Sequence, residues 1–408
     1  MLPVTLADIE EARRVLKDAV VHTPMLPAPK LSALTGAEVF VKYENFQITN
    51  SFKDRGALVK LASLSAAERA RGVVAMSAGN HAQSVAYHAA RLHIPATIVM
   101  PVTTPFVKLA ATRSHGADVV LHGETVNEAQ ERVGELVREK GYVEVHPYAD
   151  PRIIAGQGTI ALEMLEEFGE LDCLVIPIGG GGLIGGNAVA AKALRPDIEI
   201  VGVECALYPS MWNAVRGDNR PAGGSTLAEG IAVKSVSGLT VSIVRELVDD
   251  LLLVGEPDLE RAVNAYTTLQ KTVAEGAGAA GLAALLAYPE RFRGKRVGLI
   301  LSGANIDPRI LASITVRELE REHRIVSFRL SIPDRPGTLG LIATRLGALG
   351  ANILEVEHKR LLLDVPAKGA KLDVTIETRD AAHANEILTA LAADGYQPAP
   401  IDGGAGIE

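Results

Sequence analysis

Two motifs in the sequence could together hold a reactive cofactor. Lys53 lies in SFKDRG (residues 51–56), and a run of glycines at positions 179–182 follows an apolar segment. A lysine amine can form a Schiff base with an aldehyde. Main-chain N–H groups of a glycine turn that opens a helix can bind a phosphate. Pyridoxal phosphate (PLP) carries both an aldehyde and a phosphate, so the two motifs together indicate PLP.

Each motif also has a simpler interpretation. An isolated lysine is usually a solvated surface charge, although a helix N-terminus beside Lys53 could lower the pKa of its amine. Residues 180–185 fit G-x-G-x-x-G between a predicted strand and a predicted helix, and Glu204 ends the next strand. This is the dinucleotide-binding pattern in its proper context. Taken alone, the glycine run leaves a monophosphate loop and a dinucleotide loop open.

Three further motifs place polar side chains at predicted strand or helix ends. Residues 77–81 (SAGNH) follow a strand and open a helix, Ser302 ends an apolar strand, and Glu275 precedes a helix of small residues. Their simplest interpretations are a capped helix with Asn80 as a turn residue, a strand-terminating hydroxyl, and a carboxylate at a helix start.

Composition excludes several classes of function. The chain has 408 residues, 48% of them hydrophobic and 22% charged, which is typical of a globular protein of two or three domains. A net charge of −8 without a basic stripe predicts no nucleic-acid partner. No signal pattern or long apolar stretch is found, so we expect no membrane association and a cytoplasmic location. Cys173 and Cys205 lie in apolar runs and are expected in the core, and the scattered histidines predict no metal site.

Alternating strands and helices must position these motifs. Such alternation indicates parallel α/β sheets. Two such units would leave a cleft at their strand ends, where ligands usually bind. The predicted strands cover 38–43, 72–76, 96–100, 118–121, 172–178, 198–204 and 297–302, and the predicted helices include 5–19, 104–114, 124–140 and 187–194.

The pattern changes after Asn305. A charged helix is expected over 309–323, and the boundary of a separate domain is placed near residue 322. The rest reads as a compact β-α-β-β-α unit, with strands over 324–332, 351–360 and 370–377 and helices over 338–349 and 381–394.

Five motifs occur in one order: SFKDRGA, SAGNHAQ, PIGGGGL, EGAGAAG and SGANID. Through them, residues 5–321 resemble the fold-type II PLP enzymes, and most closely the threonine and serine dehydratases. The resemblance implies two open α/β units around a cleft. The large PLP-binding domain would comprise 1–45 and 149–321, and the small domain 46–148.

The resemblance also implies roles around the cofactor. Lys53 would be the Schiff-base lysine and the base at the substrate Cα. Phe52 would pack beside the cofactor ring, Asn80 would bind its phenolic oxygen, Ser302 would face its pyridine nitrogen, and Glu275 would lie near the ring. The phosphate would be held by the main-chain amides of Gly179, Gly180, Gly181 and Gly182.

The substrate carboxylate would bind the loop formed by Ser77, Ala78, Gly79, Asn80 and His81. Related serine racemases have a second serine where this chain has Ala78, so racemisation should be weak here. A hydroxyl at the pyridine nitrogen leaves the ring a weaker electron sink than a carboxylate would, which favours prompt loss of a β-leaving group.

The expected reaction is deamination of L-threonine to 2-oxobutanoate and ammonia. L-Serine or hydroxyaspartate dehydratase and threonine synthase are the alternatives within the class, and a non-catalytic amino-acid sensor is the alternative outside it. Asn50 and Asp54 depart from the usual dehydratase pattern, and SFKDRG also occurs in threonine synthases, so the substrate stays open. Eukaryotic relatives bind a divalent ion through acidic residues where this chain has Tyr208 and Ser210, so that site is not expected.

Residues 324–400 resemble an ACT domain through DRPGTL (334–339) and GANI (350–353). ACT domains usually pair and bind amino acids at their interfaces. The resemblance therefore implies a homodimer or homotetramer with allosteric control by isoleucine or valine, with Gly337 and Asn352 as effector contacts. A purely structural dimerisation module is the alternative.

Overall fold

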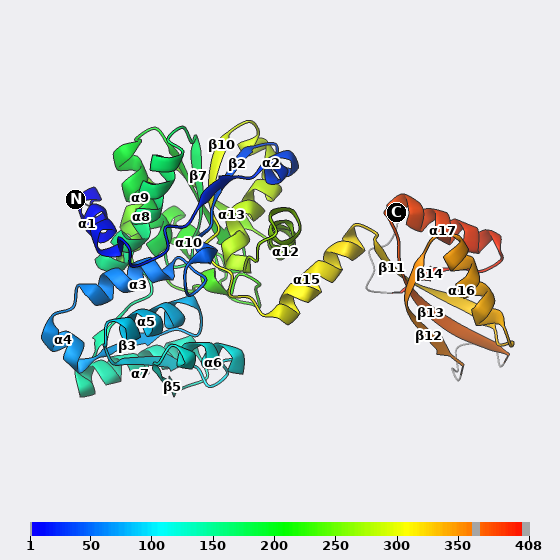
Figure 1. Cartoon of the computed structure of the whole chain (residues 1–408), viewed down its shortest axis with the longest axis horizontal. Helices are drawn as coiled ribbons and strands as arrows, with labels where there is room; N and C mark the ends of the chain where they lie inside the picture. Colours follow the sequence, from blue (N-terminus) through cyan, green and yellow to red (C-terminus); the bar gives the residue numbers. More distant parts are fainter. Residues whose placement is uncertain (1, 361–367, 402–408) are drawn as a thin grey trace. The chain divides into compact units, whose positions relative to one another are not determined.

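The computed structural model describes residues 2–360 and 368–401. The chain forms two compact units that divide after Ile306. Figure 1 shows the elements of each unit with their labels. The first unit contains two separate sheets, and the second contains one.

The larger sheet of the first unit has the order β1-β2-β10-β7-β8-β9. β1 pairs antiparallel with β2, and all other neighbours in this sheet are parallel. Its strands are β1 (Met25–Pro27), β2 (Glu38–Lys42), β7 (Cys173–Pro177), β8 (Glu199–Cys205), β9 (Asp250–Val254) and β10 (Arg296–Ile300).

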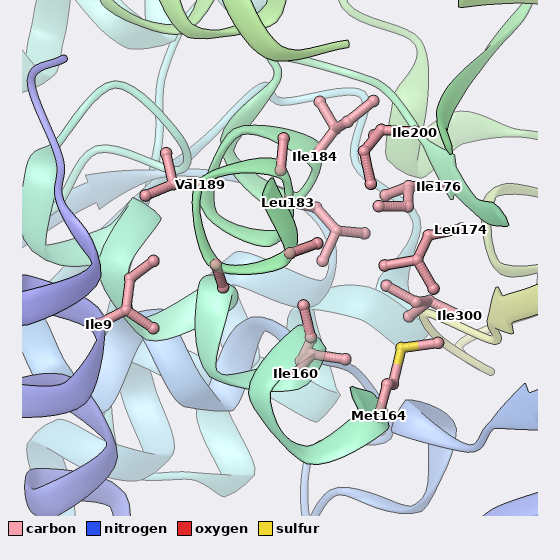
Figure 2. Packing of buried hydrophobic residues seen from close by; sticks show 14 of the residues in the cluster. Ile9, Ile160, Met164, Leu174, Ile176, Leu183, Ile184, Val189, Ile200 and Ile300 are labelled. Carbon is pink, nitrogen blue, oxygen red and sulfur yellow. The ribbon is translucent and has the colours of Figure 1, made fainter. Parts of the chain in front are cut away.

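Helices pack on both faces of this sheet (Figure 1). In Figure 2, Leu174, Ile176 and Ile200 point from the strands toward Leu183 and Ile184 of one covering helix. Their side chains belong to one buried hydrophobic cluster, so burial of apolar surface holds the layers together. The helices of this part are α1 (Leu6–Leu16), α2 (Pro29–Thr35), η1 (Glu44–Phe46), α8 (Pro151–Glu167), α9 (Gly182–Leu194), α10 (Ser210–Arg216), η2 (Glu229–Ile231), α11 (Gly238–Leu247), α12 (Glu256–Ala265), η3 (Tyr266–Gln270), α13 (Gly276–Ala287) and α14 (Pro289–Phe292).

The smaller sheet of the first unit is entirely parallel, with the order β5-β4-β3-β6. All of its strands come from the stretch between residues 73 and 144, and it has its own hydrophobic clusters. Its elements are α3 (Lys53–Ala62), α4 (Ala66–Arg71), β3 (Val73–Met76), α5 (Asn80–Arg91), β4 (Ala96–Met100), α6 (Phe106–Ser114), β5 (Asp118–Leu121), α7 (Val126–Lys140) and β6 (Val143–Glu144). The predicted fold class, two α/β sheets followed by an α+β unit, is confirmed.

After an initial helix, the second unit has the order β-α-β-β-α-β with an antiparallel sheet, which is a ferredoxin-like arrangement. Its core includes Phe328, Leu372 and Ile387. The last strand was not predicted because it is only two residues long. Its elements are α15 (Pro308–Arg321), β11 (Ile325–Pro333), α16 (Thr338–Ala348), β12 (Asn352–Lys359), β13 (Gly369–Glu377), α17 (Ala381–Ala393) and β14 (Ala399–Pro400).

One boundary differs from the sequence-based expectation. The compact second unit begins at Asp307, so α15 groups with it instead of ending the large domain at 321. The helix contacts β11, and only Ile314 on it is buried. The division of the first unit between residues 46–148 and the rest stays a prediction. The predicted ACT-like stretch, 324–400, includes residues 361–367, which lie outside the described residues.

None of the helices in the described part of the chain combines the length and the apolar character that crossing a bilayer requires.

Candidate active site

Lys53 is the first residue of α3, and its side chain is partly buried. Its Nζ donates a hydrogen bond to the carbonyl oxygen of Pro147 at 2.8 Å and lies 5.0 Å from the centre of the Phe52 ring. Removal from water lowers the pKa of Lys53 to about 8, against the opposing effect of the negative charge on Glu275. About a tenth of the amine is then neutral at pH 7, compared with less than about a thousandth for an ordinary lysine. The neutral amine is the form that attacks an aldehyde.

The segment before Lys53 is fixed against the end of β10. Ser51 forms an isolated antiparallel bridge with Gly303. The main-chain N–H of Phe52 donates to the carbonyl of Ser302 at 3.0 Å. The motifs that contain Lys53 (residues 51–56) and Ser302 (residues 302–307) are far apart in sequence, but these contacts place them side by side. Ser302 is buried, and no hydrogen-bond partner of its hydroxyl is found among the described residues.

The glycine run lies between the end of β7 and the first turn of α9. Gly181 has a φ of 90°, which favours glycine. A Cβ at Gly180 would lie 2.2 Å from the ring of Tyr148, and one at Gly179 would lie 3.0 Å from the Cα of Ile231. In the described ranges, the main-chain N–H groups of residues 179–181 have no protein acceptor. These free donors at a helix N-terminus suit an anion such as a phosphate.

Asn80 and Glu275 are directly bonded. Asn80 is the first residue of α5, and its Nδ2 donates to Glu275 Oε1 at 2.7 Å. Asn80 Oδ1 accepts a hydrogen bond of 2.7 Å from Asn305 Nδ2. Burial raises the pKa of Glu275 to about 7, and the bond from Asn80 acts in the opposite direction. The strand-end motif 302–307 and the helix-start motif 275–281 thus meet at Asn80.

The loop over residues 77–81 ends at a histidine that is held neutral. Burial lowers the pKa of His81 to about 3, with a further contribution from the positive charge of Lys53. The Nε2 of His81 therefore donates to the Val145 carbonyl at 2.7 Å. The hydroxyl of Ser77 accepts from the N–H of Gly79 at 3.1 Å, and a Cβ on Gly79 would meet no atom within 4 Å. Open space therefore borders this loop.

The contacts close into a ring. Lys53 contacts Pro147, and the following residue, Tyr148, packs on the glycine run. A Cβ at Gly230 would lie 3.4 Å from Glu275 Oε1, and the neighbouring Ile231 approaches Gly179. Glu275 accepts a hydrogen bond from Asn80, and Asn80 accepts one from Asn305. In the same segment as Asn305, the carbonyl of Ser302 accepts from Phe52, which precedes Lys53. The structure therefore brings the five sequence motifs to one place.

Two predicted residues lie elsewhere, in the second unit. Gly337 precedes α16 with a φ of 89°, and Asn352 begins β12. Asn352 Nδ2 donates to Glu377 Oε2 at 3.2 Å.

The segment Pro147–Tyr148 was not among the predicted site residues. It follows β6, a strand of only two residues, and its contact with Lys53 spans 94 positions. The HPYAD sequence at 146–150 was the one signal that could have indicated it, since a turn after a strand end borders ligand sites in parallel sheets. Tyr148 also donates from its hydroxyl to the Ser235 carbonyl at 3.0 Å.

The two departures from the dehydratase pattern have structural explanations. Asp54 is buried and accepts from the N–H and the hydroxyl of Thr49 at 3.0 and 2.5 Å. Burial opposes its ionisation, but the hydrogen bonds from Thr49 and the nearby His88 ring, whose Nε2 lies 3.4 Å from Oδ1, lower the pKa of Asp54 overall. Asn50 has a φ of 57°, a conformation that asparagine tolerates better than most residues. Asp54 therefore stabilises the turn before Lys53.

Glu204, the acidic residue that a dinucleotide-binding site would require, is engaged in other hydrogen bonds. Both oxygens of Glu204 accept 2.7 Å hydrogen bonds, from the main-chain N–H groups of Met211 and Trp212. Burial raises the pKa of Glu204 to about 7, and these main-chain bonds lower it. Glu204 is thus occupied at the start of α10. Across residues 2–360 and 368–401, no group of three or more His, Cys, Asp or Glu side chains could hold a metal ion.

Comparison with known proteins points to one family. A family profile described as pyridoxal-phosphate dependent enzyme matches residues 16–303. An L-threonine ammonia-lyase from Thermotoga maritima is 44% identical over 97% of this chain and 98% of its own length. The catabolic L-threonine dehydratase TdcB of Escherichia coli K12 is 43% identical over 77% of this chain and 97% of its own length.

Solved structures agree with the sequence relatives. A processed threonine deaminase isoform 2 from Solanum lycopersicum superposes with a TM-score of 0.72 at 36% identity, covering 76% of this chain and 86% of that one. A maize serine racemase superposes with a TM-score of 0.72 at 32% identity, covering 78% of this chain and 99% of that one.

Proposed function

The chain belongs to the pyridoxal-phosphate dependent enzymes, and on this basis we propose that it is a lyase that deaminates L-threonine to 2-oxobutanoate and ammonia. The relatives named for this activity match the chain at 44% and 43% identity. The observation that supports the proposal is the set of contacts through Pro147 and Tyr148, which connects an amine of lowered pKa to main-chain N–H groups that have no acceptor among the described residues.

The residues of the ring fit PLP. Lys53 would hold the aldehyde carbon, and the N–H groups of Gly179, Gly180, Gly181 and Gly182 would bind the phosphate. A side chain at these positions would collide with neighbouring atoms, so the amides can be approached closely only because the residues are glycines.

Three polar groups would contact the rest of the cofactor. Asn80 would donate to the phenolic oxygen, the free hydroxyl of Ser302 would face the pyridine nitrogen, and Glu275 would lie beside the ring. Phe52, whose ring lies next to the Lys53 amine, would pack against the cofactor.

When bound, PLP draws electrons away from the Cα of the attached amino acid, so that the Cα proton becomes acidic and a β-hydroxyl can leave. Lys53 would take the proton from Cα, because its amine is neutral in a useful fraction at neutral pH. The loop with Ser77, Ala78 and Gly79 would bind the substrate carboxylate through main-chain N–H groups of the first turn of α5. His81 stays neutral and adds no charge there.

Ala78 carries no group that could return a proton to the opposite face of Cα. A serine racemase is among the structural neighbours, at 32% identity. The absence of an acid at this position supports elimination over racemisation in this chain.

The charges near the site favour threonine over hydroxyaspartate. A hydroxyaspartate substrate would add a carboxylate at the β-carbon, and this carboxylate needs a cation. Lys108, whose charge acts on Glu275, is already paired with Glu229. L-Serine differs from threonine by one methyl group, which is worth about 1–3 kcal/mol in discrimination, so it remains the alternative substrate.

Threonine synthase and a non-catalytic amino-acid sensor have less support. Threonine synthase requires a phosphorylated substrate and therefore a further basic pocket. A non-catalytic sensor would have no use for a lysine of lowered pKa at this position.

The test is a substrate panel on the purified full-length protein with PLP. Ammonia and keto acid are measured for L-threonine, L-serine and L-threo-3-hydroxyaspartate. We expect the highest kcat/KM with threonine and loss of all activity in Lys53→Ala. Turnover of none of the three would refute the proposed lyase, and a preference for hydroxyaspartate would refute the substrate assignment.

We also propose that the second unit is an ACT domain that pairs in a homodimer or homotetramer and regulates activity. Its ferredoxin-like order supports this assignment. Isoleucine or valine would bind near Gly337 and Asn352 and shift the equilibrium between two states of the enzyme. Asn352→Ala in the full chain should weaken the response of the rate to isoleucine or valine, whereas Asn385→Ala, an exposed position on α17, should not. An unchanged response in Asn352→Ala would exclude that residue as a contact.

A cytoplasmic location completes the proposal. Cys173 and Cys205 are both free and buried, which suits a reducing compartment.

A further inference from the structure

A chain of side-chain amides crosses the candidate site. Asn305 Nδ2 donates to the carbonyl oxygen of Thr49 at 2.9 Å and to Asn80 Oδ1 at 2.7 Å. Asn80 Nδ2 in turn donates to Glu275 Oε1 at 2.7 Å. The four groups belong to four segments that are distant in sequence.

The two ends of this chain determine the orientation of both amides. The Thr49 carbonyl can only accept a hydrogen bond, so it must face the NH2 group of Asn305. Above pH 7, where Glu275 is mainly ionised, its carboxylate can also only accept, so it must face the NH2 group of Asn80. With both ends fixed, Asn80 Oδ1 must face Asn305. The approach of Asn50 Nδ2 to Asn305 Oδ1, at 3.4 Å, agrees with this arrangement.

The close approach depends on Gly303. A Cβ there would lie 2.6 Å from Glu275 Oε1 and 3.1 Å from Asn80 Nδ2. The carbonyl of Gly303 also accepts from the N–H of Glu275 at 3.0 Å. The segment that follows β10 therefore holds both partners of Asn80 in place.

We propose that Asn305 is a positioning residue that locks the Asn80 amide with its NH2 group, and not its oxygen, available to the phenolic oxygen of PLP. One N–H of Asn80 donates to Glu275, and the second has no acceptor among the described residues, so it is available for this contact. This inference rests on the proposed function, because that function assigns Asn80 to the cofactor.

Asn305→Asp tests the lock directly. The new carboxylate would repel both the Thr49 carbonyl and Asn80 Oδ1, so the Asn80 amide would turn and withdraw its NH2 group. We expect PLP to bind about tenfold more weakly, which is the fold-change of about one hydrogen bond. The visible absorbance of bound PLP should decrease in favour of the near-ultraviolet band, because the phenolate loses a donor. Asn305→Ala should lower the PLP affinity and the visible absorbance in the same direction, but by a smaller amount.

A double-mutant cycle with Asn80→Ala shows whether Asn305 acts through Asn80. Asn305→Asp should have no further effect on PLP affinity or absorbance in the Asn80→Ala background. Additive effects, or wild-type absorbance and affinity in both Asn305 variants, would overturn the proposal. Failure of the wild-type protein to bind PLP would instead overturn the proposed function.

Asn187→Asp is the matched control. Asn187 is a buried asparagine of α9 whose Nδ2 also donates to two carbonyls, of Gln157 at 3.2 Å and of Leu183 at 2.8 Å. The Asn187→Asp variant should unfold at a lower temperature in a thermal melt, but the ratio of the visible to the near-ultraviolet band of bound PLP should not change. A band shift in Asn187→Asp equal to that in Asn305→Asp would show a general structural effect and would also overturn the proposal.

Discussion

The amine of Lys53 donates to the carbonyl oxygen of Pro147, at 2.8 Å, while the next residue, Tyr148, lies on the glycine run. One dipeptide therefore links the group proposed for the aldehyde of PLP to the groups proposed for its phosphate. The link belongs to the protein itself, so the spacing of the two ends of the site is set before any ligand binds. Such preorganisation lowers the entropy cost of binding.

The first prediction concerns the pH dependence of cofactor attachment. Because burial lowers the pKa of Lys53 to about 8, the neutral amine becomes the major form above pH 8. The rate at which PLP attaches to apoenzyme should rise about tenfold per pH unit below pH 8 and level off above it. Stopped-flow absorbance measures this rate. A midpoint near 10, as for a solvated lysine, would contradict the prediction.

The second prediction concerns the identity of the attachment site. Borohydride reduction of the PLP-loaded protein should label the peptide that contains Lys53, as peptide mass mapping would show. Lys53→Ala should lose at least about a thousandfold in kcat, because the proton acceptor is removed. Lys60, on the same helix and ion-paired with Asp150 at 2.6 Å, supplies the control. Lys60→Ala should keep both the label and the activity. Unlabelled Lys53 in a loaded, active protein would refute the assignment.

The third prediction separates two reasons for a glycine at position 180. A Cβ there would collide with the Tyr148 ring, and it could also obstruct the phosphate. Gly180→Ala should weaken PLP binding by about tenfold or more. In Tyr148→Ala/Gly180→Ala the collision with the ring is gone. If the phosphate approach is the reason, affinity stays low in the double variant, and equilibrium titration with PLP measures it.

A return to wild-type affinity in the double variant would mean that Gly180 serves only the packing of Tyr148. Tyr148→Ala alone is the necessary control, since loss of the ring could itself weaken binding. Gly340→Ala is the control for the glycine-to-alanine change itself, because Gly340, like Gly180, has no positive φ, and a Cβ there would meet no atom within 4 Å. It should leave PLP affinity unchanged.

Much of the site could be predicted because its residues follow strand ends in parallel sheets. Asn80 and Ser302 lie where parallel sheets place ligand groups, and a local strand-to-helix pattern reveals such positions. Lys53 was predicted from its motif, and the lowering of its pKa was expected from a neighbouring helix N-terminus. The structure gives a different main cause, which is removal of the amine from water.

Other features could not be predicted because they depend on contacts between distant segments. Tyr148 follows a two-residue strand that has no periodic pattern, and its contact with the glycine run arises only in the folded chain. Asp54 looked like a departure that put the substrate in doubt, because sequence alone does not show that Thr49 and His88 are its partners. The grouping of α15 with the second unit likewise depends on its contact with β11.

The fourth prediction concerns a buried ion-pair cluster around Arg55, two residues after Lys53. Arg55 is fully buried and bonds to Glu44 at 2.8 Å and to Glu163 at 2.6 Å. Arg55→Met would remove the cation that joins two buried carboxylates. Glu163 would keep its ion pair with Lys42 at 2.7 Å, but Glu44 would lose its ion-pair partner, and breaking a buried pair typically costs about 3–5 kcal/mol. The free energy of unfolding from urea titration should fall by this amount. Unfolding monitored by fluorescence and by circular dichroism should coincide if the transition is two-state.

Arg293→Met provides the comparison for this loss. Arg293 pairs with Glu290 three residues earlier, and both side chains are exposed to solvent. Water and salt screen such a pair, so its removal should leave the unfolding midpoint unchanged within error. Equal losses in the two variants would mean that burial of the Arg55 cluster contributes nothing to stability. A large loss in Arg55→Met alone, together with reduced PLP affinity, would show that this cluster fixes the start of α3 and thereby the position of the Lys53 amine.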